Sequence, residues 1–314
     1  MAIITYSAEV AGLYGEVQNL GSLAVRLVFW PVETSAFRTF SRFGVASDHG
    51  LAHVPASESS SMRAAAAADV RPGDDAGGLK QQQAQQEQEA LQLLQGLHRG
   101  MLCVALLAAC FAPCYAFTAV HVLLTRRWSA TQAPALLAQY AVTLPVLASN
   151  GVLEACTHAR MSSRRLLMSN IFMGAVAVVH AAGLLALRAS SGSVASCTTL
   201  IALDAVAMGA RVLYSLWIIW RMHAGQIGPV AKWLPSLPSV MALLAAHACT
   251  RYSWQSFGSA LTEAELLSRL PKDMQTHALT GGVVLAALLA ALWRTERQLR
   301  VQLQRGTSSK LHMD

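Results

Sequence analysis

The sequence predicts an all-α membrane protein with about seven transmembrane helices. Of its 314 residues, 54% are hydrophobic and only 13% are charged, whereas a soluble domain usually has about 25% charged residues. The charged residues are missing from long runs, at residues 104–124, 166–187 and 277–293. Runs of about 17 residues or more are long enough to cross the hydrocarbon core of a bilayer as a helix.

The first predicted helix covers residues 13–42. It carries Arg26, Pro31 and Glu33 within an otherwise apolar stretch. Proline removes a backbone hydrogen bond and clashes with the preceding turn, so Pro31 should kink this helix. The polar C-terminal part of the helix is expected to leave the membrane. Residues 1–45 are therefore predicted as one transmembrane helix with a cytosolic extension.

A low-complexity cytosolic linker is predicted at residues 46–88. It contains a serine cluster, an alanine run and the tract QQQAQQEQ, a composition that cannot bury an apolar core. Its glutamine-rich end is compatible with a helix that leads into the next span. Residues 89–297 are predicted as a six-helix transmembrane bundle, and residues 298–314 as a cytosolic tail. The six spans of the bundle are predicted at residues 101–124, 134–158, 166–187, 194–220, 238–254 and 276–293.

Lysine and arginine residues in the connections indicate the orientation. Positive charges concentrate in the cytosolic connections of membrane proteins. Most of those outside the predicted spans fall on the side of the linker and the C-terminal tail. The linker and the tail are therefore placed in the cytosol, and the N-terminus on the opposite side. The N-terminal segment lacks the features of a cleavable signal peptide that would carry it across the membrane. We therefore expect that transmembrane spans upstream of this sequence are missing from it.

The composition also argues against other classes of protein. A net charge of +7 and a pI of about 9.3 could indicate a nucleic-acid-binding protein. The sequence has no basic stripe and no nucleic-acid motif, however, so membrane orientation explains the charge better. The six cysteines form no CxxC pair, and no HExxH, P-loop or GxSxG pattern is present. No enzyme, metal site or cofactor is therefore predicted.

Four charged side chains stand out inside the predicted spans, Arg26, Glu154, Asp204 and Arg211, and Glu33 is a fifth that lies nearer a helix end. A charge in the centre of a bilayer costs about 2.5–3.5 kcal/mol on insertion scales, so such residues are candidates for function. They either pair with one another to hold the bundle together or line a polar cavity that accepts a charged headgroup. Asp204 and Arg211 lie about 10 Å apart along one helix, so Arg211 is expected to find its partner on another helix.

Arginines in a cavity suit phosphate, because the guanidinium fork binds it bidentately. The span that contains Glu154 has a second unusual feature, since Asn150 and Gly151 precede this residue by one turn. We expect a local break of the helix here, with exposed backbone.

The segment YGEVQNLGSLAVRLVFWPVET resembles the signature of the Rft family, the oligosaccharide-lipid translocation proteins of the endoplasmic reticulum. The matching residues are Tyr14, Val17, Asn19, Gly21, Ser22, Leu23, Arg26, Pro31 and Glu33. Thr34 departs from the pattern, because the family has a second Glu there. Two further matches follow along the chain, Asn150-Gly151-x-x-Glu154 and the weaker Met208-x-x-Arg211. Upstream of the last match the family usually has Asn, where this sequence has Asp204 and Ala207.

The resemblance implies a fold. Rft proteins are similar to members of the multidrug/oligosaccharidyl-lipid/polysaccharide flippase superfamily, which includes multidrug and toxin extrusion antiporters and bacterial lipid II flippases. Such proteins have about fourteen helices in two lobes around a central cavity. The seven predicted spans would correspond to the last seven helices, so the chain would be the C-terminal half of such a protein.

The resemblance also implies a function. The family is associated with moving Man(5)GlcNAc(2)-diphosphate-dolichol from the cytosolic to the luminal leaflet of the endoplasmic reticulum membrane, for protein N-glycosylation. Two alternatives stay open: a non-transporting accessory protein of the same pathway, and an ion-coupled small-molecule exporter of the same fold. The expected partners are the dolichyl-diphosphate oligosaccharide, membrane lipid and proteins of the N-glycosylation pathway, without nucleic acid.

Residue roles follow from the same resemblance. Arg26 and Arg211 would contact the diphosphate, while Glu154 and Asp204 would hold or gate these arginines. Asn150 joins them as a candidate for substrate binding. The residues expected to act structurally within the motifs are Asn19, Gly21, Pro31, Glu33 and Gly151.

Overall fold

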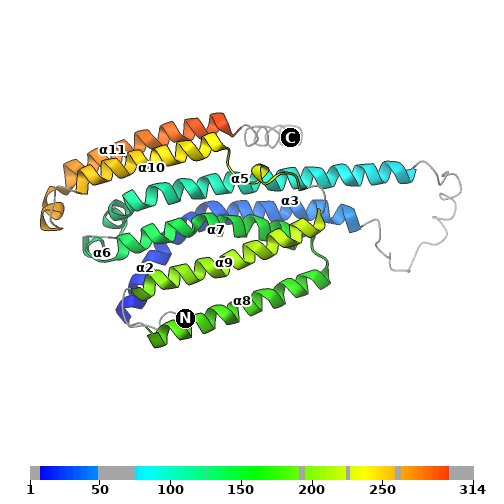
Figure 1. Ribbon diagram of the computed structural model, residues 1–314, viewed down its shortest axis with the longest axis horizontal. Helices are drawn as coiled ribbons and strands as arrows, with labels where there is room; N and C mark the ends of the chain where they lie inside the picture. Colours follow the sequence, from blue (N-terminus) through cyan, green and yellow to red (C-terminus); the bar gives the residue numbers. More distant parts are fainter. Residues whose placement is uncertain are drawn as a thin grey trace, which may run out of the picture.

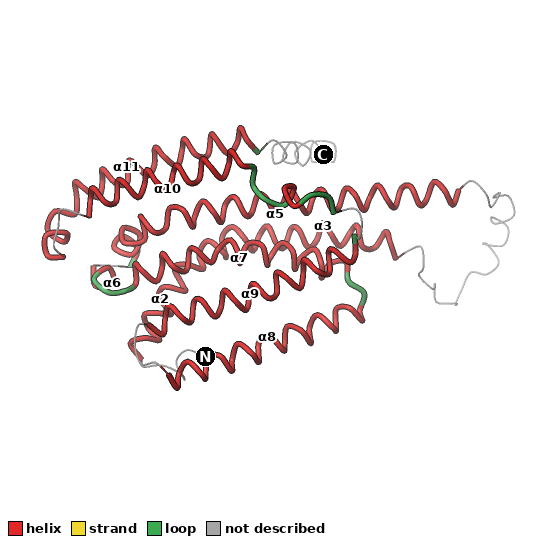
Figure 2. Tube along the Cα trace, viewed as in Figure 1, coloured by secondary structure: helices red, strands yellow, loops and turns green. Residues whose placement is uncertain are grey.

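The computed structural model describes residues 8–48, 75–124, 126–190, 195–223, 227–258 and 263–296. Within these ranges all regular structure is helical, and no β-strand is present. Seven long helical rods lie side by side with roughly similar axis directions in the described part of the chain (Figure 1, Figure 2). The all-α architecture predicted from the sequence is thereby confirmed.

The first rod is bent. It consists of α2 (Ala8–Ala24), the π-helical turn η1 (Val25–Phe29) and α3 (Trp30–Asp48). Pro31 is the second residue of α3, so the wide turn comes directly before the residue whose ring would clash with a regular preceding turn. The distortion predicted at Pro31 is therefore present, and it changes the direction of the rod between α2 and α3 (Figure 1).

The other elements follow in sequence order. They are α5 (Asp75–Leu123), α6 (Arg126–Ser129), α7 (Ala133–Arg160), α8 (Ser163–Ser190), α9 (Ala195–Met222), η2 (Val230–Lys232), α10 (Leu237–Gly258) and α11 (Glu263–Thr295). The glutamine-rich end of the predicted linker forms the N-terminal part of α5, which projects from the bundle (Figure 1). The rest of the linker, residues 49–74, and the tail, residues 297–314, lie outside the described residues.

Helix α7 is the centre of the bundle and packs against α3, α5 and α9. Leu153 and Val152 of α7 are fully buried with Phe29, Phe40 and Leu94 from the first rod and α5. The helix is continuous from Ala133 to Arg160. The break predicted at Asn150 and Gly151 is therefore wrong, because the Asn150 amide bonds a side chain one turn onward and Gly151 keeps helical geometry.

Five of the described helices are long and apolar enough to cross a membrane. They are Gln81–Leu123, Ala133–Arg160, Ser163–Ala186, Cys197–Met222 and Gln275–Thr295. Five of the seven predicted spans are thus supported. The bent first rod and α10 do not meet this criterion within the described residues, and α10 covers the span that was the least hydrophobic of the prediction. The fourteen-helix arrangement in two lobes stays a prediction.

Ionic contacts tie the helices together at one end of the bundle. Arg160 of α7 donates to Glu87 of α5 at 2.9 Å and to Nε2 of His223 at 3.0 Å. Burial and the Arg160 charge lower the pKa of His223, although Glu87 opposes them. Because an arginine can only donate, Nε2 of His223 is the acceptor in this contact. A second ion pair, Arg99 with Glu296, joins α5 to the end of α11.

Candidate functional site

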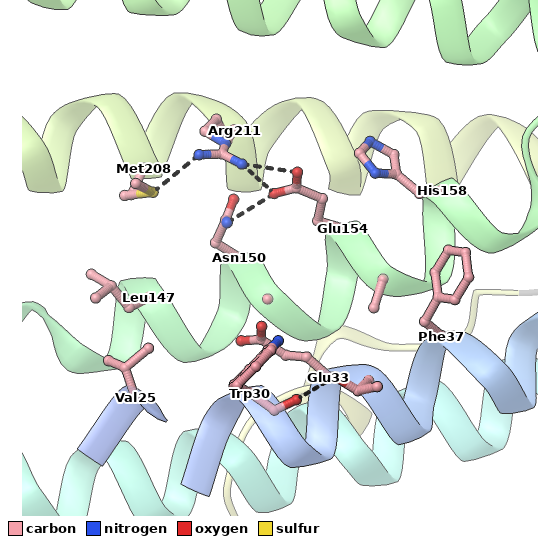
Figure 3. A pocket seen from close by; sticks show the side chains of 13 residues that line it. Val25, Trp30, Glu33, Phe37, Leu147, Asn150, Glu154, His158, Met208 and Arg211 are labelled. Carbon is pink, nitrogen blue, oxygen red and sulfur yellow. Dashed lines mark hydrogen bonds and ion pairs between the residues drawn. The ribbon is translucent and has the colours of Figure 1, made fainter. Parts of the chain in front are cut away.

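A cleft of about 550 Å³ with both polar and apolar lining lies between α3, α7 and α9 (Figure 3). Helix α3 contributes apolar and aromatic side chains with one carboxylate, α7 an amide and a second carboxylate, and α9 a guanidinium. The lining residues are Val25, Trp30, Glu33, Thr34, Phe37, Leu147, Asn150, Gly151, Glu154, Ala155, His158, Met208 and Arg211. The cleft thus combines residues from all three sequence matches that carried the family resemblance.

Arg211 and Glu154 form an ion pair within one wall of the cleft. The Nη2 atom of Arg211 donates to both carboxylate oxygens of Glu154, at 2.8 and 2.7 Å. Asn150 Nδ2 donates to the same carboxylate at 2.9 Å, since residues four apart on α7 share a helix face. The side chains of Arg211 and Glu154 are 27% and 19% exposed, so the pair is largely removed from solvent and its two charges neutralise each other.

This arrangement answers two questions that the sequence left open. Arg211 does find its partner on another helix, as expected from its distance to Asp204 along α9. For Arg211 and Glu154, mutual pairing and the lining of a cleft are compatible, whereas the acceptance of a charged headgroup stays a prediction. The ion pair joins α7 to α9 and at the same time forms one wall of the cleft (Figure 3).

Glu33 occupies the opposite wall. Its side chain lies directly over Gly151, where an added Cβ would overlap the Glu33 carboxyl group. A glycine at this position therefore permits the close approach of α3 to α7. Within the described residues Glu33 has no hydrogen bond or ion pair, and it is partly exposed toward the cleft. The sequence predicted a structural role for Glu33, whereas in the structure its side chain lines the cleft.

Arg26 lies outside the cleft. Its guanidinium is exposed and donates to the carbonyl oxygen of Asn19 at 3.0 Å and to the Ser22 hydroxyl at 2.9 Å, all within its own helical rod. The structure therefore does not bring Arg26 and Arg211 together around one ligand. Asn19 contributes its backbone, whereas Gly21 allows the ring of Tyr140 on α7 to pack against α2.

Asp204 also lies outside the cleft and forms no ion pair with an arginine of the described ranges. It accepts a hydrogen bond from the Tyr14 hydroxyl at 2.6 Å, and Nε2 of His180 lies 2.8 Å from its other oxygen. Asp204 thus links α9 to α2 and α8 instead of holding Arg211. No role was predicted for His180 from the sequence, although an ionisable residue inside an otherwise apolar run is a candidate partner for a carboxylate in another span.

The sequence also missed Trp30, Phe37 and His158 as members of the site. Trp30 and Phe37 are seven residues apart on α3 and so share one helix face, and both line the cleft. His158 lies one turn after Glu154 on α7, and its Nε2 is 3.2 Å from the Ser169 hydroxyl. In the described ranges no group of three or more His, Cys, Asp or Glu residues is arranged to hold a metal ion.

The apolar helices and their buried charged groups define the class of the chain, an all-α protein of the multi-pass membrane type. More specifically, it belongs to the Rft family, since it matches the family described as "Rft protein" over residues 1–305. The resemblance inferred from the three motifs is thereby confirmed.

The chain is also similar to a curated relative, the Man(5)GlcNAc(2)-PP-dolichol translocation protein RFT1 of Xenopus tropicalis. The two are 25% identical over 292 residues, which cover 92% of this chain and 46% of the relative. The chain thus spans about half the length of the relative that it matches. No solved structure matches it.

Proposed function

We propose that this chain takes part in moving a dolichyl-diphosphate-linked oligosaccharide from the cytosolic to the luminal leaflet of the endoplasmic reticulum membrane, for protein N-glycosylation. The observation that carries the proposal is the match to the Rft family over residues 1–305. The name of the amphibian relative supplies the chemical identity of the lipid and the pathway. Because the chain spans about half of that relative, the activity proposed is that of the whole relative, to which the region matched by this chain contributes.

The cleft supports the proposal physically. A lipid with a large polar headgroup crosses the hydrocarbon core only if polar side chains replace the water that the headgroup loses. The cleft supplies such groups among helices whose outer surfaces are apolar. Glu154 lies six residues before the end of α7 at Arg160, which is about 9 Å along a helix. The site is therefore close to the end of the bundle that the basic residues assign to the cytosol.

Complementation tests the proposal. The chain is expressed in cells depleted of their own Rft protein, alone and together with the upstream half of a relative, and glycosylation of a secreted reporter is measured. Restored glycosylation that Arg211→Ala abolishes, at unchanged protein abundance, supports a direct role. No restoration in either combination would contradict the proposal. Liposomes with the labelled lipid then separate transport from an accessory role, since only a transporter accelerates transbilayer movement.

A further inference from the structure

The charge of the cleft does not match a diphosphate. Among the lining residues Glu33 and Glu154 are carboxylates and Arg211 is the single guanidinium. Glu154 already accepts both hydrogen bonds from Nη2 of Arg211. A diphosphate entering here would have to displace one carboxylate and face a second at short range, and like charges repel strongly in a medium of low dielectric constant. Arg26, the other arginine expected to bind phosphate, is not at the cleft.

The hydrogen-bonding capacity left in the cleft suits a neutral ligand. The Oδ1 atom of Asn150 and the Nε atom of Arg211 are buried and have no partner among the described residues. Asn150 itself is only 9% exposed, and its Nδ2 is already engaged by Glu154. One atom is thus an acceptor without a donor and the other a donor without an acceptor. A hydroxyl group can donate to the first and accept from the second, whereas a phosphate oxygen can only accept.

Glu33 extends this pattern. Its carboxylate is an acceptor of up to four hydrogen bonds, and within the described residues it has no donor. A ligand that carries several hydroxyl groups would supply donors to Glu33 and Asn150 at once. Carboxylate and amide acceptors on facing helices therefore favour a polyol over an anion.

The α3 rim of the cleft adds two aromatic side chains. Trp30 is 66% exposed and Phe37 is 45% exposed, and both line the cleft. Seven residues on a helix correspond to about 10 Å along its axis, so the rings can contact two successive units of a chain. The C–H face of a sugar ring is apolar and carries slight positive charge, which complements the negative face of an aromatic ring. A phosphate has no such face.

We propose that the cleft between α3, α7 and α9 binds sugar residues of the lipid-linked oligosaccharide through their hydroxyl groups and C–H faces. The cleft does not bind the diphosphate of that lipid. The identity of the lipid rests on the proposed function. Trp30 and Phe37 stack on the sugar rings, while Asn150 and Glu33 accept hydrogen bonds from hydroxyl groups. The Arg211–Glu154 pair holds the wall of the site and offers Nε–H of Arg211 as a donor.

The test measures binding of a soluble probe to the purified full chain in lipid nanodiscs. The probe is a short α-linked mannose oligosaccharide, detected by saturation-transfer NMR, with inorganic pyrophosphate as competitor. We expect saturable sugar binding that excess pyrophosphate does not displace. Trp30→Ala should weaken it at least tenfold, while Trp293→Ala, an exposed tryptophan on α11, should leave it unchanged. Glu33→Gln should also weaken binding and, because Glu33 has no structural partner among the described residues, should not impair folding.

Three results would overturn the assignment. They are displacement of the sugar by pyrophosphate, binding of pyrophosphate alone with loss in Arg211→Gln, and the absence of sugar binding in a folded chain. The outcome is separable from that of the proposed function. Sugar binding without complementation refutes a role in translocation but supports the sugar site, whereas complementation without sugar binding refutes the sugar site alone.

Discussion

The ion pair between Arg211 and Glu154 should couple α7 to α9 energetically. A hydrogen bond between charged groups contributes about 1.5–3 kcal/mol. The two contacts come from one nitrogen atom, so we count them as one shared bond and expect a coupling energy of about 2 kcal/mol, or about thirtyfold in the ratio of folded to unfolded protein. The perturbation is a double-mutant cycle of Arg211→Gln and Glu154→Gln. The assay is equilibrium unfolding of the full chain in mixed micelles with increasing SDS.

A matched cycle serves as the control. Arg26 donates to the Ser22 hydroxyl in an exposed contact within one helical rod, so Arg26→Gln with Ser22→Ala should show a coupling below about 0.5 kcal/mol. Each single change at Arg211 or Glu154 should destabilise the chain, because it leaves the other charge without its partner. A coupling energy for this pair no larger than that of the control would refute the view that it joins the two helices.

Three more outcomes are expected. Gly21→Ala should lower the unfolding free energy by about 1–3 kcal/mol, because a Cβ there overlaps the rigid ring of Tyr140; an unchanged thermal midpoint would contradict the contact. Gly151→Ala should cost less stability than Gly21→Ala, because the Glu33 side chain can move away, but it should reduce mannose-oligosaccharide binding in the NMR assay. Burial raises the pKa of Glu296, but hydrogen bonds from two serines and an arginine, with the arginine charge, outweigh it and lower the pKa. The stabilisation from Glu296 is therefore present above about pH 4.3 and is lost as the pH falls through the pKa of the folded state. In thermal unfolding measured at a series of pH values, Glu296→Gln should reduce the loss of stability at acid pH.

The sequence predicted the helices well because a span in lipid needs a long apolar run, and that requirement is local. The bend at Pro31 was predictable for the same reason, since the ring of proline disturbs the turn before it. The prediction was weaker where a helix is less apolar. Helix α10 packs on α11 and α5 with a small apolar cluster around Leu243 and Leu288, and it does not meet the criterion for a membrane span.

The site was only partly predictable, because charge and spacing do not specify how helices rotate against one another. The partner of Arg211 was correctly expected on another helix, but Asp204 pairs with Tyr14 and His180 through contacts that only the packing of α2 and α8 creates. The expected break at Asn150 failed because its side chain bonds within the helix. The sequence could not assign Trp30 to the cleft, since an exposed tryptophan of a membrane helix can equally face lipid.

The closeness of the cleft to the sugar of the lipid-linked oligosaccharide is most directly measured by site-specific photo-crosslinking. A benzophenone amino acid replaces Phe37 at the cleft or, as the control, Trp293 on α11, and each full chain is reconstituted with the radiolabelled lipid. We predict that labelling from position 37 is several times stronger than labelling from position 293. We also predict that an excess of unlabelled dolichyl diphosphate without sugar does not suppress the labelling from position 37. Equal labelling from both positions, or full suppression by the sugar-free lipid, would contradict the account.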